Sequence, residues 1–356
     1  MPTEGHLVDV AVIGGGQAGL ATGYFLRRTK ADFVILDDQD RPGGAWPEYW
    51  DSLRLFSPAE HSMLPGWWMP EEKGQEYPSA RHVAWYLGEY ERRYALPVHR
   101  PARVRRVERA GDRLRLVTDG DTWSARRVIS ATGTWAAPYI PDLPGRGVFE
   151  GEQIHTVDYR GPDRFAGQRV VVVGGGNSAA QILAELSTVA QTTWATARPP
   201  RFLPDDLDGR ALFAIATRAQ RSQSAGLGEL GDIVVVPSVR EARERGALKA
   251  EPMFDHLTRT GVAWSDDTTM ECDTVLWCTG FRPSLDHLTS SGLVDGRGRV
   301  AMEGTRSVAE PRLHLVGYGD WTGSASATLI GAARTARVTV AQIAQELESE
   351  AGSATE

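Results

Sequence analysis

Short aliphatic runs alternate with stretches of helical periodicity along this chain. The first run, residues 8–13, is almost uniformly apolar and is followed by an expected helix at 18–29 and a second apolar run at 32–36. Apolar runs of this kind are typical of parallel strands that are buried on both faces, and their alternation with helices is typical of α/β folds. The pattern therefore predicts an α/β protein with parallel sheets.

The same strand–helix–strand pattern returns between residues 170 and 196, so the repetition is at the scale of a domain. Further buried strands are expected at 128–130, 274–277 and 313–316, and a closing helix near residue 325. The proline-rich stretch 138–144 is typical of a linker. A chain of 356 residues is also long for one ordinary core, which favours two domains.

Each of the two repeated strands ends in a glycine cluster that opens a helix. The residues that fit G-x-G-x-x-G/A are Gly14, Gly16 and Gly19 in the first cluster, and Gly174, Gly176 and Ala179 in the second. In this pattern one glycine makes the turn, the next lets the backbone approach a pyrophosphate, and a small third residue allows close packing of helix on strand. One copy could be an ordinary glycine-rich turn. Two copies in the same context predict two Rossmann-like dinucleotide sites.

The end of the second strand distinguishes the two sites. Asp37 lies 23 residues after Gly14, and an acid there accepts hydrogen bonds from an adenosine ribose. The same interval from Gly174 reaches Ala197, which is followed by Arg198. A guanidinium suits a 2′-phosphate better than a 2′-hydroxyl. The first site is therefore predicted to bind FAD or NAD and the second NADPH, with a solvated surface arginine as the alternative for Arg198 and Arg201 as a second phosphate ligand.

Two dinucleotide sites in one chain suggest electron transfer from NADPH to a flavin. Gly319 and Asp320 follow a short strand, a position that resembles the one where two-dinucleotide flavoproteins bind the FAD ribityl chain and pyrophosphate. The predicted organisation is an FAD domain at 1–145 and 273–345, with an NAD(P)H domain inserted at 146–272. The turns ATG at 131–133 and CTG at 278–280 would be the crossings. The acidic end, 346–356, is predicted to be disordered.

The segment just before the second loop carries a longer motif. Phe149, Gly151, His155 and Tyr159 fit F-x-G-x-x-x-H-x-x-x-Y. This resembles the fingerprint of the flavin-containing monooxygenases (class B flavoprotein monooxygenases), in the form with Tyr where Baeyer–Villiger enzymes have Trp. PGGAW, ATG and CTGFRP also resemble this family. The chain length and WDSLRLFSPAEHSMLPGW are most similar to the small bacterial members, including those of arsenic-resistance operons.

The resemblance implies an activity. NADPH would reduce FAD, reduced flavin would react with O2 to give a C4a-hydroperoxide, and this would oxygenate a small soft nucleophile, such as a sulfide or amine, or a ketone. The cofactor would carry the chemistry, and the protein would bind, orient and exclude water. No catalytic residue is assigned with certainty, and no metal ligand set is expected: His61, His82, His99 and His256 have no ligand spacing.

The cofactor-binding residues follow from the loops and the resemblance. For FAD they are Gly14, Gly16, Gln17, Ala18, Gly19, Asp37, Gly44, Trp46, Ala131, Thr132, Gly133, Gly319 and Asp320. For NADPH they are Gly174, Gly176, Asn177, Ser178, Ala179, Arg198, Thr279 and Gly280.

The chain departs from the family pattern at two places. Many members carry an asparagine after an LRL-like stretch, where it helps to hold the peroxyflavin, whereas here Phe56 and Ser57 follow and are expected near the flavin. Pro199 replaces the Ser or Thr that often follows the phosphate-binding arginine. This leaves use of NADH as well as NADPH open.

His155 has two interpretations: it fixes the nicotinamide domain from the linker, or it caps a turn. A structural role is favoured over that of a general base. The aromatic segment 46–68 is expected to form a wall for flavin and substrate, or simply to pack under a long loop.

Composition and charge exclude several functional classes of protein. The net charge of −7 disfavours nucleic-acid binding, the absence of a long apolar run disfavours a membrane span, and the N-terminus lacks the pattern of a signal peptide, which predicts a cytoplasmic location. Cys272 and Cys278 are interpreted as core residues rather than a redox pair. The expected partners are O2 and a small substrate, with a homodimer as the commonest assembly. The alternatives are an NAD(P)H-dependent flavin reductase or oxidase, and a dinucleotide-sensing protein.

Overall fold

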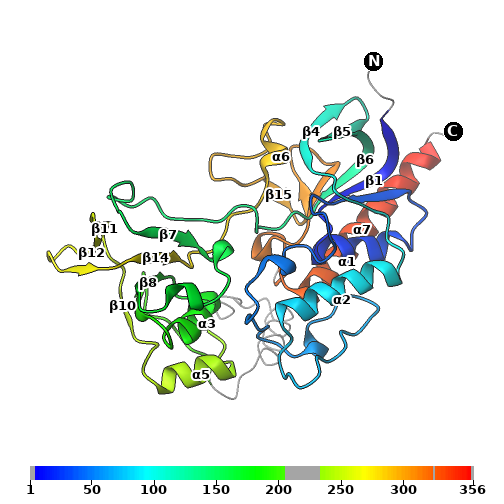
Figure 1. The fold of residues 1–356 in the computed structure, drawn as a ribbon. Coiled ribbons are helices and arrows are strands. Elements are labelled where there is room, and N and C mark those ends of the chain that lie inside the picture. Colours follow the sequence, from blue (N-terminus) through cyan, green and yellow to red (C-terminus); the bar gives the residue numbers. More distant parts are fainter. Residues whose placement is uncertain (1–4, 205–232, 324, 354–356) are drawn as a thin grey trace. The chain divides into compact units, whose positions relative to one another are not determined.

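The computed structural model describes residues 5–204, 233–323 and 325–353, and the chain forms two compact units (Figure 1). Unit 1 consists of Met1–Pro47, Ala59–Ala136 and Pro283–Glu356, and unit 2 of Glu48–Pro58 and Ala137–Arg282. Each unit is built on a sheet with parallel strands, so the predicted α/β class is confirmed.

The sheet of unit 1 has the strand order β15-β16-β17-β6-β1-β2-β3, and β5 joins β4 to β6. The strands that run parallel are β1 (His6–Ile13), β2 (Phe33–Leu36), β3 (Val98–His99), β6 (Thr122–Ser130) and β17 (Leu313–Leu315). The antiparallel strands are β4 (Val104–Ala110), β5 (Arg113–Thr118), β15 (Met302–Glu303) and β16 (Arg306–Ser307).

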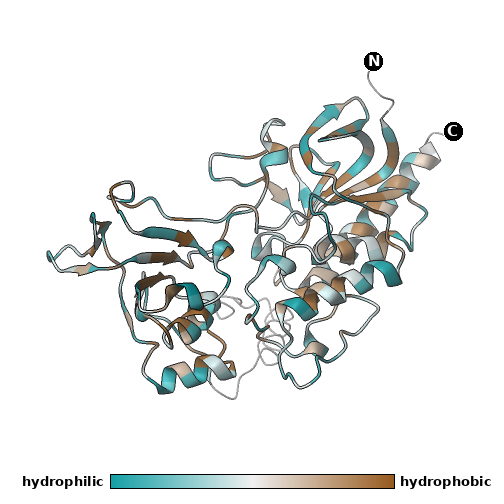
Figure 2. Cartoon of the chain, viewed as in Figure 1, coloured by the Kyte–Doolittle hydropathy of each residue, from teal (hydrophilic) through white to brown (hydrophobic). Residues whose placement is uncertain are grey.

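The helices of unit 1 explain why β1 is apolar throughout its second half. They are α1 (Gln17–Leu26), α2 (Ala80–Arg93), α6 (Asp286–Thr289) and α7 (Leu329–Ser353). Val10–Ile13 is at most 4% exposed because both faces of the sheet are covered. Helix α1 lies against α7 and is buried on nearly all sides. Figure 2 shows the result as hydrophobic strands with mixed colouring on α2.

Unit 2 has a parallel sheet with the strand order β10-β9-β8-β14-β7. Its strands are β7 (Glu152–His155), β8 (Arg169–Val173), β9 (Gln191–Thr196), β10 (Ala250–Pro252) and β14 (Thr274–Trp277). A second, antiparallel sheet contains β11 (His256–Leu257), β12 (Gly261–Ala263) and β13 (Thr269–Glu271). The helices among its described residues are α3 (Asn177–Leu186) and α5 (Pro237–Glu244). Phe254, Val262 and Trp277 pack in the core that the two sheets share.

The division of the chain differs from the predicted boundaries at 145 and 273. Strand β14 pairs with β7 and β8, so the residues after 273 begin in unit 2 rather than in the first domain. Tyr139 donates its N–H to the carbonyl of Gly280, and Arg282 donates to Ala137, so 137–145 also belongs to unit 2. The boundary follows strand pairing, which the linear pattern did not reveal.

The prediction of a disordered tail at 346–356 is wrong for the residues up to Ser353, and 354–356 lie outside the described residues. Helix α7 continues because its apolar spacing extends to Leu347, which is buried. The acids also have partners: Arg127, only 7% exposed on β6, bonds Glu346 and Glu350. Two of the acids in this segment therefore pair with a buried arginine from within a helix.

Deleting residues 346–356 should destabilise the protein by about 2–4 kcal/mol, because it removes both carboxylate partners of Arg127 and the buried Leu347. Urea unfolding of the two chains measures the difference. The control is Glu348→Ala, which removes an exposed carboxylate of the same segment and should leave the midpoint unchanged. Equal midpoints for the truncated and the full-length chains would contradict the structural role of the tail.

Candidate dinucleotide-binding sites

The first glycine loop, residues 14–19, packs against two other turns of unit 1, the ATG turn at 131–133 and the PGGAW turn at 42–46. A Cβ on Gly14, whose φ is +105°, would lie 2.6 Å from the carbonyl oxygen of Ala131. A Cβ on Gly19 would lie 1.8 Å from the carbonyl oxygen of Gly14. These two contacts require glycine for packing reasons alone, and they bring the ATG turn and the start of α1 together.

Gly16 differs from these two glycines, because a Cβ there would make only an ordinary van der Waals contact. The nearest atom to a Cβ there would be the Cα of Gly44, at 3.8 Å, and its φ of −80° is allowed for any residue. Gly16 is also the N-cap of α1, and no side chain caps the helix. The missing side chain of Gly16 and the uncapped N–H groups fit a pyrophosphate that must approach the backbone closely.

Asp37 lies at the end of β2, 2% exposed, beside the same loop. Its carboxylate accepts the N–H of Gly15 at 3.1 Å and the Nε–H of Arg100 at 3.0 Å, and Arg100 also bonds Glu91. Burial raises the pKa of Asp37 above its ordinary value, and the two hydrogen bonds only partly offset this. Arg100 was not among the predicted site residues, because nothing in its local sequence marks it.

Gln17 joins the PGGAW turn to the segment before α7. Its side-chain oxygen accepts the indole N–H of Trp46 at 3.0 Å, and its amide donates to the carbonyl of Ala327 at 2.5 Å. A Cβ on Gly44 would lie 2.8 Å from the Cα of Gly16, so this turn lies directly on the loop. The structure thus brings the predicted residues Gln17, Gly44 and Trp46 together, and joins Gln17 to Ala327 near the other end of the chain.

Tyr318 organises the remaining turns of unit 1 and was also missed from the sequence. Its hydroxyl accepts the N–H of Thr132 at 3.2 Å and lies 2.7 Å from the hydroxyl oxygens of Thr132 and Ser130. Ser130 in turn lies 3.0 Å from Nε2 of the buried His287. This network fixes the ATG turn, which ends at Gly133, against the residue that precedes Gly319.

The Gly319–Asp320 turn also lies near the start of α1. A Cβ on Gly317 would lie 2.6 Å from the Cβ of Ala18. Asp320 itself is exposed in the short helix η6 (Gly319–Trp321). The turns after β1, β6 and β17 therefore converge at the carboxyl ends of these parallel strands, the position where open α/β sheets bind ligands.

The second glycine loop repeats the first in detail. A Cβ on Gly174, with φ of +129°, would lie 2.2 Å from the carbonyl oxygen of Cys278, as Gly14 meets Ala131. Cys278 donates its N–H to Val173 as Ala131 donates to Ile13. Gly176 has nothing within 4 Å of a Cβ, and no side chain caps α3. This loop fits a dinucleotide by the same criteria.

The small residues after Gly176 are used within unit 2. The Asn177 side chain accepts the N–H of Val234 at 2.9 Å, and Ala179 is fully buried, while Ser178 lies in the first turn of α3. Arg198 is exposed, and its carbonyl oxygen would lie 3.9 Å from a Cβ on Gly175. Arg198, the residue predicted to bind the 2′-phosphate, therefore has its backbone beside the second glycine loop.

His155 is held through both ring nitrogens. Nε2 donates to the carbonyl of Gly280 at 3.0 Å, and Nδ1 accepts the N–H of Val157 at 3.3 Å, capping the short helix η3 (Thr156–Asp158). Burial lowers the pKa of His155, which favours the neutral ring that this pattern requires. Thr279 also donates its hydroxyl to the carbonyl of Tyr139. With both nitrogens engaged, His155 joins two turns and is not placed as a general base.

The aromatic segment 46–68 is divided between the two units. Trp46 bonds Gln17 in unit 1, whereas Trp50, 1% exposed, packs edge-to-face on Tyr159 in unit 2. Trp67 packs on Tyr86, back in unit 1. The following Trp68 is 66% exposed. Phe56 and Ser57 belong to the part carried by unit 2, where Ser57 is buried.

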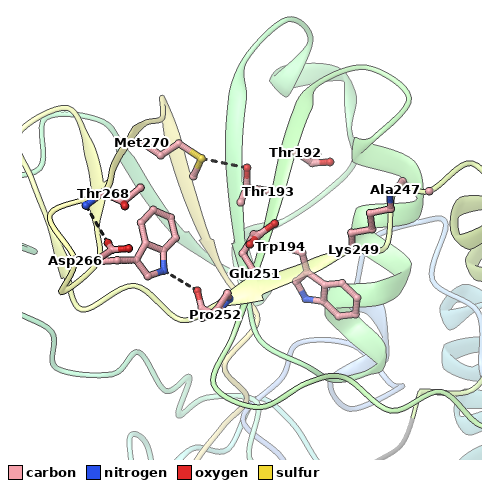
Figure 3. Close-up of a pocket in the computed structure, with 12 residues that line it drawn as sticks. Thr192, Thr193, Trp194, Ala247, Lys249, Glu251, Pro252, Asp266, Thr268 and Met270 are labelled. Atoms are coloured by element: carbon pink, nitrogen blue, oxygen red, sulfur yellow. Dashed lines mark hydrogen bonds between the residues drawn. The ribbon is translucent and has the colours of Figure 1, made fainter.

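A cavity of about 590 Å³ lies elsewhere in unit 2, beside β9, β10 and the β12–β13 turn (Figure 3). Lys249, Glu251, Trp264 and Asp266 line it, and the side chain of Thr193 donates to Met270 across it. None of the residues predicted to bind NADPH lines this cavity.

Within the described residues there is also no group of His, Cys, Asp and Glu side chains arranged to hold a metal ion. Nor does any described helix combine the length and apolar character needed to cross a membrane.

Two glycine loops of this kind, each at the carboxyl end of a parallel sheet, define a two-dinucleotide-binding oxidoreductase. The family model for pyridine nucleotide-disulphide oxidoreductases matches residues 11–206. A flavin-containing monooxygenase from Stenotrophomonas maltophilia is 51% identical, with a TM-score of 0.90 over 96% of this chain and 99% of the other. The chain belongs to the flavin-containing monooxygenases within this oxidoreductase family, and membership implies FAD and NADPH as cofactors.

Other relatives agree with the fold. An uncharacterized CzcO-like oxidoreductase of Geobacillus kaustophilus is 28% identical over 334 residues, covering 92% of this chain and 95% of the relative. A bacillithiol disulfide reductase from Bacillus cereus has a TM-score of 0.73 at 19% identity, over 96% of this chain and all of the other. The second likeness shows the fold alone.

Replacing Arg198 by Ala should raise the apparent KM for NADPH about tenfold or more, because a charged hydrogen bond to the 2′-phosphate would be lost, while the KM for NADH changes little. Steady-state oxidation of both cofactors measures this split. Arg259→Ala, which removes an exposed arginine paired with Glu150 in the same unit, is the control. Equal effects of Arg198→Ala on both cofactors would remove this residue from the phosphate site.

Proposed function

We propose that this enzyme is an NADPH- and O2-dependent flavin monooxygenase in which unit 1 binds FAD and unit 2 binds NADPH. One observation carries the assignment of the cofactors: the two loops share their geometry but differ at the next strand end. Unit 1 has the buried acid Asp37 there, and unit 2 has Ala197 followed by the exposed Arg198. The acid suits a free ribose hydroxyl and the guanidinium suits a 2′-phosphate.

Unit 1 would hold FAD by its backbone and by Asp37. The N–H groups at the start of α1, left open by Gly16, would bind the pyrophosphate, and Asp37 would accept from the adenosine ribose. Arg100 keeps this carboxylate oriented although burial disfavours its charge. The converging turns at Thr132–Gly133 and Gly319–Asp320 would complete the site.

Unit 2 would hold NADPH at the start of α3, with Gly176 open to the pyrophosphate and Arg198 at the 2′-phosphate. Thr279 and Gly280 lie on the turn that presses against Gly174 through Cys278. His155 bonds the same turn, so its proposed role is to keep the NADPH loop and the fingerprint segment in one arrangement.

Bound FAD would supply the chemistry: with a hydride from NADPH it would activate O2 as a C4a-hydroperoxide, from which one oxygen atom would go to a small sulfide, amine or ketone and the other would leave as water. The protein would orient the two cofactors and exclude water from them. We place this reaction in the cytoplasm, as the sequence predicts. The name of the monooxygenase from Stenotrophomonas maltophilia supports oxygenation as the outcome.

The second candidate is a flavin reductase or oxidase that releases hydrogen peroxide. Phe56 and Ser57, in place of the family's asparagine, favour it because no amide is available at that position to hold the oxygenated flavin. A dithiol relay is not part of this candidate. Burial raises the pKa of Cys272 to about 11 and that of Cys278 to about 12, so both thiols stay protonated and unreactive.

Stopped-flow absorbance distinguishes the two candidates. The FAD-loaded enzyme is reduced with NADPH and then mixed with O2, and the monooxygenase should show a distinct hydroperoxyflavin spectrum before reoxidation. Adding a thioether or amine that is a substrate should shorten the lifetime of this species and give one oxygenated product per NADPH. Direct reoxidation with stoichiometric peroxide, whatever compound is added, would contradict the monooxygenase and support the oxidase.

A further inference from the structure

The segment Glu48–Pro58, here called the strap, leaves and rejoins unit 1 along the chain but packs in unit 2. Its flanking residues, Pro47 and Ala59, both belong to unit 1. The strap contains Phe56 and Ser57, the two residues that the family resemblance places near the flavin. What holds the strap in unit 2 therefore bears on the flavin chemistry.

Helix α3 holds the strap through two side chains. Gln181 makes a pair of hydrogen bonds with the backbone of Arg54: its oxygen accepts the N–H at 3.3 Å, and its amide donates to the carbonyl at 3.2 Å. One turn further along α3, Glu185 accepts the hydroxyl of Ser52 at 2.5 Å. Gln181 and Glu185 are four residues apart, so they lie on the same face of the helix.

The fingerprint tyrosine completes this arrangement. Tyr159 donates its hydroxyl to the other carboxylate oxygen of Glu185 at 2.6 Å. Its ring is fully buried between Trp50 of the strap, which meets it edge-to-face, and Phe165, which stacks on it. Tyr159 thus touches the strap and at the same time orients the carboxylate that bonds Ser52.

The amino end of the same helix is the proposed NADPH site. Helix α3 begins at Asn177, directly after the open Gly176, and Gln181 follows only one turn later. A pyrophosphate bound at this end would fix α3, and α3 would fix Arg54 and Ser52. The strap is therefore attached to the helix that binds NADPH rather than to the unit from which the chain enters it.

We propose that Glu185, oriented by Tyr159, is a positioning residue that couples occupancy of the NADPH loop to the order of the strap and hence to the placement of Phe56 and Ser57. This inference rests on the proposed NADPH site in unit 2. It assigns to the tyrosine of the fingerprint a contact that its sequence position did not reveal.

Hydrogen exchange followed by mass spectrometry tests the coupling without turnover. In the wild-type protein, NADP⁺ should slow exchange both at the start of α3 and in the strap, including the Arg54 amide that Gln181 binds. Ser52→Ala removes one exposed hydroxyl and should raise strap exchange about tenfold. In this variant NADP⁺ should still protect α3 and the Arg54 amide, which Gln181 binds, but no longer the strap residues around position 52. Ser52→Thr, which restores a hydroxyl, should recover the wild-type pattern.

Two further variants keep the test specific. Tyr159→Phe retains the buried ring and should reproduce the effect of Ser52→Ala, since Glu185 then loses its orienting donor. Ser187→Ala changes a serine at the end of the same helix that bonds Ala184 and Arg245, and it should leave strap exchange unchanged.

The outcomes separate the coupling from the proposed function. Protection of α3 by NADP⁺ with no change in the strap, or an unaltered strap in Ser52→Ala, would overturn the coupling while leaving the NADPH site intact. No protection of either segment would overturn the NADPH site and the coupling together.

Discussion

The close contact between a loop glycine and the carbonyl of a neighbouring turn is the constraint on which both halves of this protein depend. Gly14 meets Ala131 and Gly174 meets Cys278, in each case at a distance that leaves no room for a Cβ. The contact exists because the turn continues the strand beside the loop: Ala131 and Cys278 each donate to the last residue of the first strand. Without glycine, neither turn could lie where a dinucleotide would meet it.

Because both loops share this glycine contact, discrimination between dinucleotides depends on residues outside the loops. The backbone of the two loops offers the same uncapped helix start, which recognises phosphates but does not distinguish one dinucleotide from another. The difference lies at the end of the following strand, where unit 1 buries Asp37 with Arg100 and unit 2 exposes Arg198. One protein can therefore use the same structural element twice and still present a different side chain beside each copy.

Sequence reasoning located these loops because their chemistry depends on residues that are close together in the chain. It identified Asp37 by the same local logic and assigned the chain to its family. It missed Arg100, which lies 63 residues from Asp37 and is brought there by the pairing of β2 with β3. Tyr318 could have been predicted, because it adjoins the predicted Gly319 and a buried tyrosine hydroxyl needs hydrogen-bond partners.

The domain boundaries were less predictable, for a physical reason. Membership in a unit follows strand pairing and side-chain contact rather than chain order, so β14 and the strap belong to unit 2 although each adjoins residues of unit 1 along the chain. The tail was mispredicted for a similar reason: Glu346 and Glu350 pair with a buried arginine on β6, which lies far away in the sequence. No local composition shows where such a partner lies.

The most direct test of the account replaces the two open glycines one at a time by Ala. Neither change strains the protein itself, since Gly16 and Gly176 have ordinary φ angles and no atom within 3.4 Å of a Cβ, so a loss of binding reports the ligand alone. FAD content after purification and NADP⁺ affinity by calorimetry are measured for both variants. We expect a crossed result: Gly16→Ala loses FAD, whereas Gly176→Ala retains FAD and binds NADP⁺ at least tenfold more weakly. Loss of FAD in Gly176→Ala, or unchanged binding of both cofactors in both variants, would contradict it.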